Sequence, residues 1–222
     1  AFLESFLSLQ SRVAEIGLYN ALAQVAIKIT APGVPDFYQG TELWDFSLVD
    51  PDNRRPVDYD LRRRVLADLR RACDQAGADR GPLVRELLSG WKDGRIKLYV
   101  TMAALHHRRA HTALFCHGRY VPLETGGAHG AHVVGFARVH EGESILALVP
   151  RLVCGLAPDR TGLAVGPEVW HDTWVATESG VHQYRHILTG AVLEPADIDG
   201  RPALRLGDVF RDCPVALLEK IT

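Results

Sequence analysis

The hydrophobic period of the chain changes near residue 113, and this change limits the class of fold that the chain can adopt. Up to that point apolar residues recur every three or four positions, which is the spacing of helices that bury one face. Beyond it, short apolar and β-branched runs are separated by glycine, proline and aspartate, as in strands joined by turns. The sequence therefore predicts an α+β protein with its helices first and its strands second.

Three stretches of the first half have a helical pattern. The apolar positions of the first 30 residues fit two helices, or one helix with a break near Ser11: Leu3, Phe6, Leu7, Leu18, Leu22, Val25, Ala26 and Ile29. Asp60 is expected to cap a second stretch, whose apolar residues recur every four positions: Leu61, Val65, Leu69 and Cys73. Its arginines mostly lie off this stripe, which predicts a solvated face: Arg62, Arg63, Arg64, Arg70 and Arg71. A further helix is expected over residues 96–109, following Gly94.

The second half has the pattern of a β domain. Residues 132–139 and 144–149 are apolar or β-branched runs joined by three polar residues and a glycine, which predicts a hairpin. Further strands are expected near residues 169–176, 182–188, 203–209 and 215–220. Short strands at this spacing favour an antiparallel β-sandwich.

Composition excludes several classes of function. The 222 residues are 47% hydrophobic, enough to bury a core, and the formal net charge is −2. With acidic and basic residues spread evenly along the chain, we expect neither a nucleic acid nor an anionic membrane as partner. The chain has no long apolar run, and its first residues lack the features of a secretory signal, which makes the cytoplasm the default location.

Cysteine and histidine usage gives no metal or disulfide signature. Cys73, Cys116, Cys154 and Cys213 are widely spaced without a C-x-x-C pair, so we expect four buried free thiols. His107 and His111 are four residues apart and can share a helical face. Because no cysteine or acidic ligand accompanies them at a metal-ligand spacing, we expect no metal site there.

Residues 31–59 have the composition of a binding loop. Pro32, Gly33 and Pro35 stop the preceding helix, and Gly33 can adopt a positive φ. Val34–Gln39 reads as one short buried strand. Flat rings and hydrogen-bonding groups that suit the faces and hydroxyls of sugars then follow: Glu42, Trp44, Asp45, Asp50, Asp52, Asn53, Arg54 and Arg55.

The same loop resembles a known family. Six residues match the eighth-strand pattern of the α-amylase superfamily of glycoside hydrolases: Pro32, Gly33, Pro35, Tyr38, Gly40 and Glu42. The continuation DFYQGTELWDFSLVDPDNRRPVDY is similar to the maltooligosyl trehalose synthase branch of that superfamily. The resemblance extends through the helix before the loop and, more loosely, through residues 93–109, so it covers about half of the chain.

This resemblance implies a fold and an activity. Residues 1–112 would be the end of a (β/α)8 catalytic barrel with its last helices and eighth strand, and residues 113–222 a C-terminal β-sandwich. The family converts the reducing-end α-1,4 bond of a maltooligosaccharide to an α,α-1,1 bond, without a metal or organic cofactor. Its paired Asp and Glu carboxylates precede the eighth strand, so no catalytic residue is assigned here, and we expect this chain to be inactive alone.

The resemblance also implies a sugar-contacting wall, because barrel sites are built from the loops that follow the strands. The candidate substrate-binding residues are Tyr38, Gln39, Glu42, Trp44, Asp50, Asp52, Asn53, Arg54 and Arg55. Tyr38 is as readily a core residue, Trp44 can instead bury the loop against the barrel, and Glu42 has a loop-orienting position in the family. One of Arg54 and Arg55 is expected to face the site, unless both only pair with nearby aspartates to hold the loop.

Two other functions remain open at this stage. One is a different α-amylase-type hydrolase. The other is a carbohydrate-binding β module, for which Trp170, Trp174 and Tyr184 could form a platform, although sandwiches commonly bury tryptophan.

The implied barrel strands next to Val34–Gln39 are not encoded in this chain. The helices of the first half must therefore bury their apolar faces against another part of the protein or another copy of it. We expect self-association of this half or docking onto the β domain, with no ladder partners present to support formation of the strand.

Overall fold

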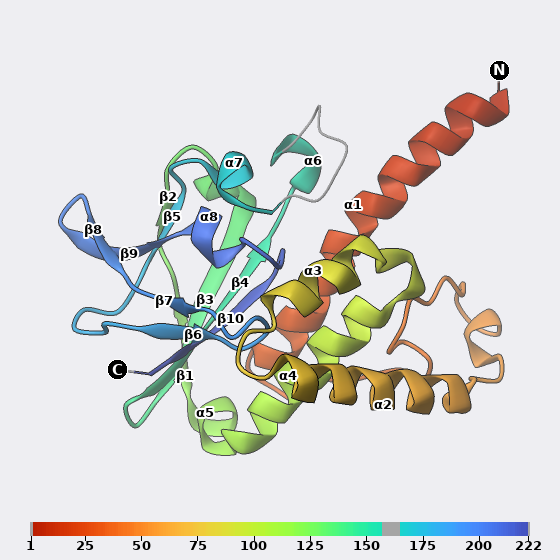
Figure 1. The fold of residues 1–222 in the computed structure, drawn as a ribbon, viewed down its shortest axis with the longest axis horizontal. Helices are drawn as coiled ribbons and strands as arrows, with labels where there is room; N and C mark the ends of the chain where they lie inside the picture. The colour runs from red at the N-terminus through yellow and green to blue at the C-terminus, as the bar shows by residue number, and fades with distance from the viewer. Residues whose placement is uncertain (1, 157–164, 222) are drawn as a thin grey trace.

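The computed structural model describes residues 2–156 and 165–221. Helices come first and antiparallel sheets second, which confirms the predicted α+β class (Figure 1). The α-helices are α1 (Phe2–Thr30), α2 (Tyr59–Ala76), α3 (Gly81–Ser89), α4 (Arg95–Ala110), α5 (Thr112–His117), α6 (Val153–Leu156), α7 (Pro167–Trp170) and α8 (Leu206–Val209). Short 3-10 turns occur at η1 (Asp52–Arg54), η2 (Trp91–Asp93) and η3 (Gly130–His132).

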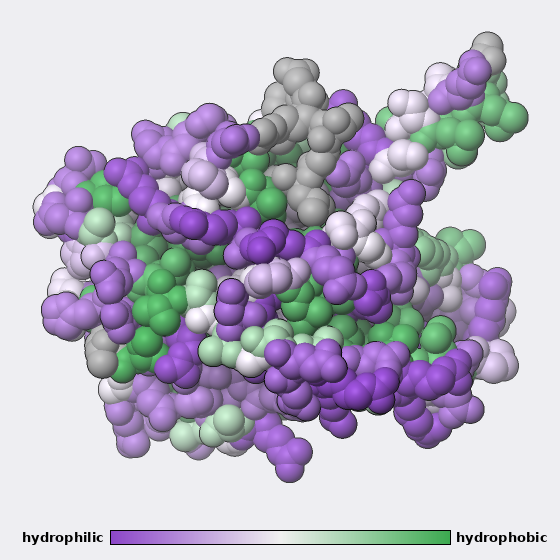
Figure 2. Space-filling view, in the orientation of Figure 1, coloured by the Kyte–Doolittle hydropathy of each residue, from purple (hydrophilic) through white to green (hydrophobic). Residues whose placement is uncertain are grey.

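The first helix, α1, continues from Phe2 to Thr30 without the break expected near Ser11. Its second half is buried as predicted, with Leu18, Leu22 and Ile29 at most 2% exposed. Its first half differs from the prediction, because Leu3, Phe6, Leu7 and other apolar residues there are exposed. This end of α1 projects beyond the rest of the described residues, and hydrophobic side chains line it in Figure 2.

The start of α2 lies two residues before the predicted position. The side chain of Asp58, not Asp60, accepts a hydrogen bond from the backbone N–H of Leu61 and caps the helix. Most of its arginines do face solvent, but Arg62 is largely buried. Arg62 reaches back to the preceding loop, which the apolar stripe alone could not reveal.

The strands form two antiparallel sheets. The larger has the order β1 (Arg119–Pro122), β3 (Val133–His140), β4 (Glu143–Pro150), β10 (Ala216–Lys220), β6 (Tyr184–His186) and β7 (Val192–Leu193). The smaller has the order β2 (Thr125–Gly126), β5 (Trp174–Ala176), β9 (Arg201–Arg205) and β8 (Ala196–Ile198).

The predicted hairpin is β3 and β4, joined by Glu141 and Gly142, which both have positive φ. This backbone conformation is that of the tight turns whose twist matches paired strands.

Two of the other predicted strands are partly helical. Val169 and Trp170 belong to α7, which Pro167 starts at a position where its missing N–H is not needed. Residues 206–209 form α8. The ring centres of Trp170 and Phe210 lie 4.9 Å apart in the core. These two short helices therefore pack on the apolar core instead of extending the sheet.

The six-stranded sheet is buried on both faces. Alternate residues of β4 point in opposite directions, and Ile145, Ala147 and Val149 pack with the helices of the first half. Leu146 and Leu148 pack on the other side, with residues of the smaller sheet such as Leu204. The helical half therefore docks on the β half within one chain, which is one of the two outcomes expected for its apolar faces.

A buried arginine joins the two halves. Arg138 of β3 is 1% exposed, and it donates hydrogen bonds to the carbonyl oxygens of Thr30 (3.0 Å), Phe115 (2.9 Å) and Gly118 (2.8 Å). These carbonyls belong to the C-terminal ends of α1 and α5, where backbone acceptors lack partners within the helix and the macrodipole favours a cation. Burial lowers the pKa of Arg138, but a guanidinium stays charged in proteins.

The cysteines are free, but two of the four are not buried as predicted. Cys73 and Cys213 are buried, and burial raises the pKa of Cys213 to about 12. Cys116 and Cys154 are exposed. Cys116 lies within α5 and Cys154 within α6, on sides of these short helices that face solvent, so their apolar neighbours in the sequence did not predict burial.

Replacement of the buried arginine tests its structural role. We expect Arg138→Met to lower the free energy of unfolding by about 3 kcal/mol, because two buried carbonyl groups and a partly buried one lose their donor. Urea unfolding followed by circular dichroism measures this value. The control is Arg119→Met, an exposed arginine of β1, which should change the free energy by less than about 0.5 kcal/mol. Equal effects of the two substitutions would contradict the proposed role of Arg138.

Candidate functional site

The candidate loop runs from the end of α1 to the start of α2. It contains no strand at Val34–Gln39, contrary to the sequence prediction, and Val34 is 94% exposed. No strand among the described residues pairs with this segment, so the backbone has no ladder to join. Side chains hold it instead: Lys28 donates to the carbonyl of Asp36 at 3.0 Å, and Arg108 donates to that of Gly33 at 2.6 Å.

An ion pair with α2 fixes the middle of the loop. Arg62 donates from Nε to Glu42 Oε2 at 2.8 Å and from Nη2 to the carbonyl of Gly40 at 2.6 Å. Both side chains are less than a third exposed. Gly40 has φ +88°, and a Cβ there would lie 3.2 Å from Val57. These contacts tie the middle of the loop to α2 through Glu42 and Gly40.

Trp44 packs the loop against the start of α4. Its indole N–H donates to the carbonyl of Trp91, and Lys97 lies 5.6 Å from its ring centre. Lys97 also donates to the carbonyl of Leu43 at 3.0 Å. Burial and the nearby charge of Lys28 lower the pKa of Lys97. The ring of Trp44 is half-buried in this arrangement, so part of its surface faces outward.

The two adjacent arginines both pair with aspartates of the same loop. Arg54 pairs with Asp50, and Arg55 pairs with Asp52, which also accepts a hydrogen bond from the N–H of Leu48 at 2.8 Å. The arginine side chains remain 69% and 75% exposed. Both contacts are therefore compatible with a loop-holding role and leave the guanidinium groups open to solvent.

The remaining candidates differ in their surroundings. Tyr38 is 45% exposed and Gln39 is exposed, so neither is a core residue in this structure. The side-chain oxygen of Asn53 is buried without a hydrogen-bond partner. Asp45, outside the candidate set, accepts two hydrogen bonds from Ser47, which lower the pKa of its carboxyl. The loop thus presents a tyrosine, an amide and two guanidinium groups on its surface.

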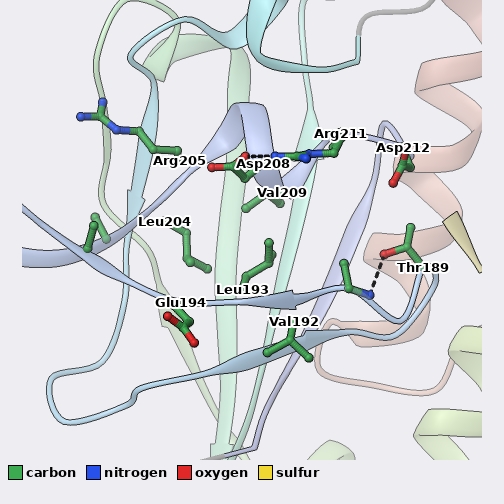
Figure 3. A pocket seen from close by; sticks show the side chains of 13 residues that line it. Thr189, Val192, Leu193, Glu194, Leu204, Arg205, Asp208, Val209, Arg211 and Asp212 are labelled. Carbon is green, nitrogen blue, oxygen red and sulfur yellow. Dashed lines mark hydrogen bonds and ion pairs between the residues drawn. The ribbon is translucent and has the colours of Figure 1, made fainter. Parts of the chain in front are cut away.

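A pocket of about 570 Å³ lies in the β half, away from this loop. Figure 3 shows that Val192, Leu193 and Leu204 lie around it, with Asp208 and Arg211 paired at one side. Asp212, also at the pocket, pairs with Arg85 of α3. Because these charged groups neutralise each other, the pocket shows no arrangement that suggests acid or base chemistry.

The predicted carbohydrate platform is not formed. Trp170 and Tyr184 are fully buried, and Trp174 is half-buried below Arg201 at 5.3 Å. Trp170 and Trp174 lie on different elements, so they do not share the face of one strand. The prediction that these three rings form a flat sugar-binding surface is therefore wrong.

Sequence reasoning missed one cluster with metal-ligating side chains. His107 of α4 and His111 just after it lie beside Glu219 of β10, with one ligand atom from each within 4.8 Å of the others. The acidic partner is distant in sequence, so ligand spacing could not reveal it.

None of the described helices is long and apolar enough to cross a membrane.

Comparison with known proteins confirms the predicted resemblance. No family model matches the chain. It is 36% identical over 202 residues to a protein of Mycobacterium tuberculosis (strain CDC 1551 / Oshkosh) that is provisionally named maltooligosyl trehalose synthase, and equally to that of strain H37Rv. The match includes 90% of this chain and 20% of each relative, so the chain spans about a fifth of the length of the curated relatives it matches.

Solved structures show the same likeness. The maltooligosyltrehalose synthase of Arthrobacter ramosus matches 98% of this chain with 34% identity and a TM-score of 0.71, over 24% of its own length. A second crystal structure of a maltooligosyl trehalose synthase matches 99% of this chain with 25% identity and a TM-score of 0.65, also over 24% of its length. The chain corresponds to the C-terminal part of these enzymes.

A double-mutant cycle tests whether Glu42 orients the loop through Arg62. We expect Glu42→Gln and Arg62→Gln to show a coupling energy of about 1 kcal/mol in urea unfolding, because the pair is partly buried and its charges are only weakly screened. The matched control is Asp60 with Arg63 on the same helix, where both side chains are more than 75% exposed. That pair should couple by less than about 0.5 kcal/mol. A Glu42–Arg62 coupling no larger than the control would refute the loop-orienting role.

Proposed function

We propose that this chain is the C-terminal part of an intramolecular transglucosylase that converts the reducing-end α-1,4 bond of maltooligosaccharides to an α,α-1,1 bond. The observation that carries this proposal is the 36% identity to the relatives from M. tuberculosis over 90% of the chain. The likeness to the A. ramosus enzyme extends over 98% of the chain and supports it independently of the loop sequence.

The proposed division of the chain follows from this correspondence. Residues 1–112 would complete a (β/α)8 catalytic barrel, and residues 113–222 would form the C-terminal β-sandwich domain. The two antiparallel sheets with a shared apolar core support the second assignment. The part of the loop after Gln39 then follows the eighth strand position of the barrel, at the end where such enzymes bind substrate.

We assign the sugar-contacting role to the exposed surface of this loop. Tyr38 can stack on a glucose ring, and the amide of Gln39 can bind its hydroxyls. One of Arg54 and Arg55 would form hydrogen bonds to the hydroxyls of a terminal sugar, with Asp50 and Asp52 holding the two guanidinium groups in place. Glu42 and Trp44 contribute by holding the loop in the required position, and Asn53, whose side-chain oxygen has no hydrogen-bond partner, remains a proposed substrate-binding residue.

No catalytic residue of the reaction is assigned to this chain. Retaining chemistry at a glycosidic bond needs one carboxylate as nucleophile and a second carboxyl as acid and base. The carboxylates among the candidate residues are already engaged: Glu42, Asp50 and Asp52 each pair with an arginine. The chemistry would therefore come from carboxylates elsewhere in the complete enzyme, and the present residues bind and orient the substrate without a metal or organic cofactor.

Activity measurements with maltopentaose test this proposal. In the full-length enzyme, we expect Arg54→Lys or Arg55→Lys to lower kcat/KM by about tenfold at one position and to have little effect at the other, because adjacent loop residues seldom point the same way. The loss reflects the rigid fork of the guanidinium group, which lysine lacks. Arg63→Lys on the exposed face of α2 is the control and should leave activity unchanged.

Two results would contradict the proposal. Turnover of maltopentaose by the isolated 222-residue chain would show that the catalytic groups are encoded within it. Full activity of both loop variants, with unchanged melting temperature, would show that the arginines only hold the loop.

A further inference from the structure

Three side chains from two elements converge where the end of α4 meets the six-stranded sheet. The ring nitrogen Nε2 of His111 lies 3.4 Å from Oε1 of Glu219 on β10. His107, one helical turn earlier, stacks on His111 with ring centres 4.3 Å apart. One ligand atom of each of the three residues lies within 4.8 Å of the other two.

A second carboxylate determines which nitrogen of His111 faces Glu219. The Nδ1 atom of His111 lies 3.3 Å from Oε2 of Glu143, the first residue of β4. A neutral imidazole that donates its Nδ1 proton to Glu143 presents a lone pair at Nε2. Since a carboxylate oxygen of Glu219 faces that lone pair, the two acceptors repel each other unless a proton or a metal ion lies between them.

The third side chain has an unused nitrogen. Nε2 of His107 is buried and has no hydrogen-bond partner. Because this nitrogen has no protein partner, it is available to bind a metal ion. Buried ring nitrogens without a partner are costly, and a metal ion would satisfy this one.

We propose that His107, His111 and Glu219 bind a zinc ion at this junction. Two imidazoles and one carboxylate form a ligand set that zinc accepts, with water as the fourth ligand. Neighbouring ligand atoms of a tetrahedral zinc site lie about 3.3 Å apart, given bond lengths of about 2.0 to 2.1 Å. The 3.4 Å separation of His111 Nε2 and Glu219 Oε1 agrees with this distance between ligand atoms.

Glu143 would act on the metal through His111. A carboxylate that accepts the other N–H of a ligating histidine fixes the orientation of the ring and strengthens it as a ligand. Glu143 occupies that position without reaching the three-ligand cluster itself. It is therefore a positioning residue, and its loss should weaken metal binding without abolishing it.

The site would join the two halves of the chain. His107 lies in α4 and His111 just after it, whereas Glu219 and Glu143 lie on β10 and β4. A bound zinc would stabilise the docking of the helices on the sheet, since a ligand that binds only the folded state raises its stability. This role is structural and is separate from the sugar-contacting loop.

A second group of histidines serves as the control. The ring centre of His129 lies 5.7 Å from that of His132 and 5.4 Å from that of His171. This group, in which only His171 is exposed, could take up zinc weakly without forming a defined site. Arg185, whose Nη1 lies 3.9 Å from Oε2 of Glu219, opposes a cation there and sets a limit on the affinity.

Calorimetric titration of the chelator-treated protein with zinc chloride tests the proposal, with metal content after dialysis as a second measurement. We expect one zinc per chain, no competition by magnesium, and a higher melting temperature with zinc present. His111→Ala and Glu219→Gln should each weaken binding at least 100-fold, and Glu143→Gln about 10-fold. His132→Ala should leave the affinity unchanged.

Three results would overturn the proposal. The first is no zinc binding by the wild-type protein, which would mean that a proton joins His111 to Glu219. The second is unchanged affinity in Glu219→Gln, a substitution of the same shape that should not disturb folding. The third is loss of binding in His132→Ala, which would place the metal at the other histidines.

Discussion

The buried guanidinium of Arg138 is the interaction on which the arrangement of the chain depends. It extends from β3, the second strand of the six-stranded sheet, and satisfies backbone carbonyls at the ends of α1 and α5. Charged hydrogen bonds of this kind are among the stronger ones in proteins, and they are costly to lose when the acceptors are buried. The end of α1 is thereby fixed on the sheet, and the loop that follows it starts from a defined position.

The packing around Arg138 makes the helices and the sheet parts of one core. Leu22 and Ile29 of α1 share a cluster with Ile145 and Leu217 of the sheet, so apolar contacts continue across the boundary proposed at residues 112 and 113. The same contacts position the candidate loop, because Lys28 and Arg108 reach its first residues from helices within this core. The candidate loop is therefore oriented by the sheet, through α1 and α4.

Sequence reasoning succeeded where local chemistry decides the structure. The hairpin of β3 and β4 follows from its turn residues, and α4 follows from Gly94 and a regular apolar stripe. Sequence reasoning failed where residues that are distant in the sequence determine the structure. Val34–Gln39 has the residues of a strand but no neighbouring strand, Arg62 leaves the solvated face of α2 to reach Glu42, and Glu219 joins two histidines from the far end of the chain. Within the candidate loop, the sequence indicated which side chains suit a sugar. It could not distinguish arginines that pair with aspartates from an arginine that faces the substrate.

The central claim is that the helices and the sheet unfold as one unit. Native-state hydrogen exchange, followed by mass spectrometry at increasing urea concentration, measures the opening free energy of each segment. We predict that the second half of α1, α4 and the β3–β4 hairpin open with the same free energy, equal to that of global unfolding. If α1 and α4 exchange at a free energy several kcal/mol below that of the hairpin, the two halves are separate units, and the account based on Arg138 is wrong.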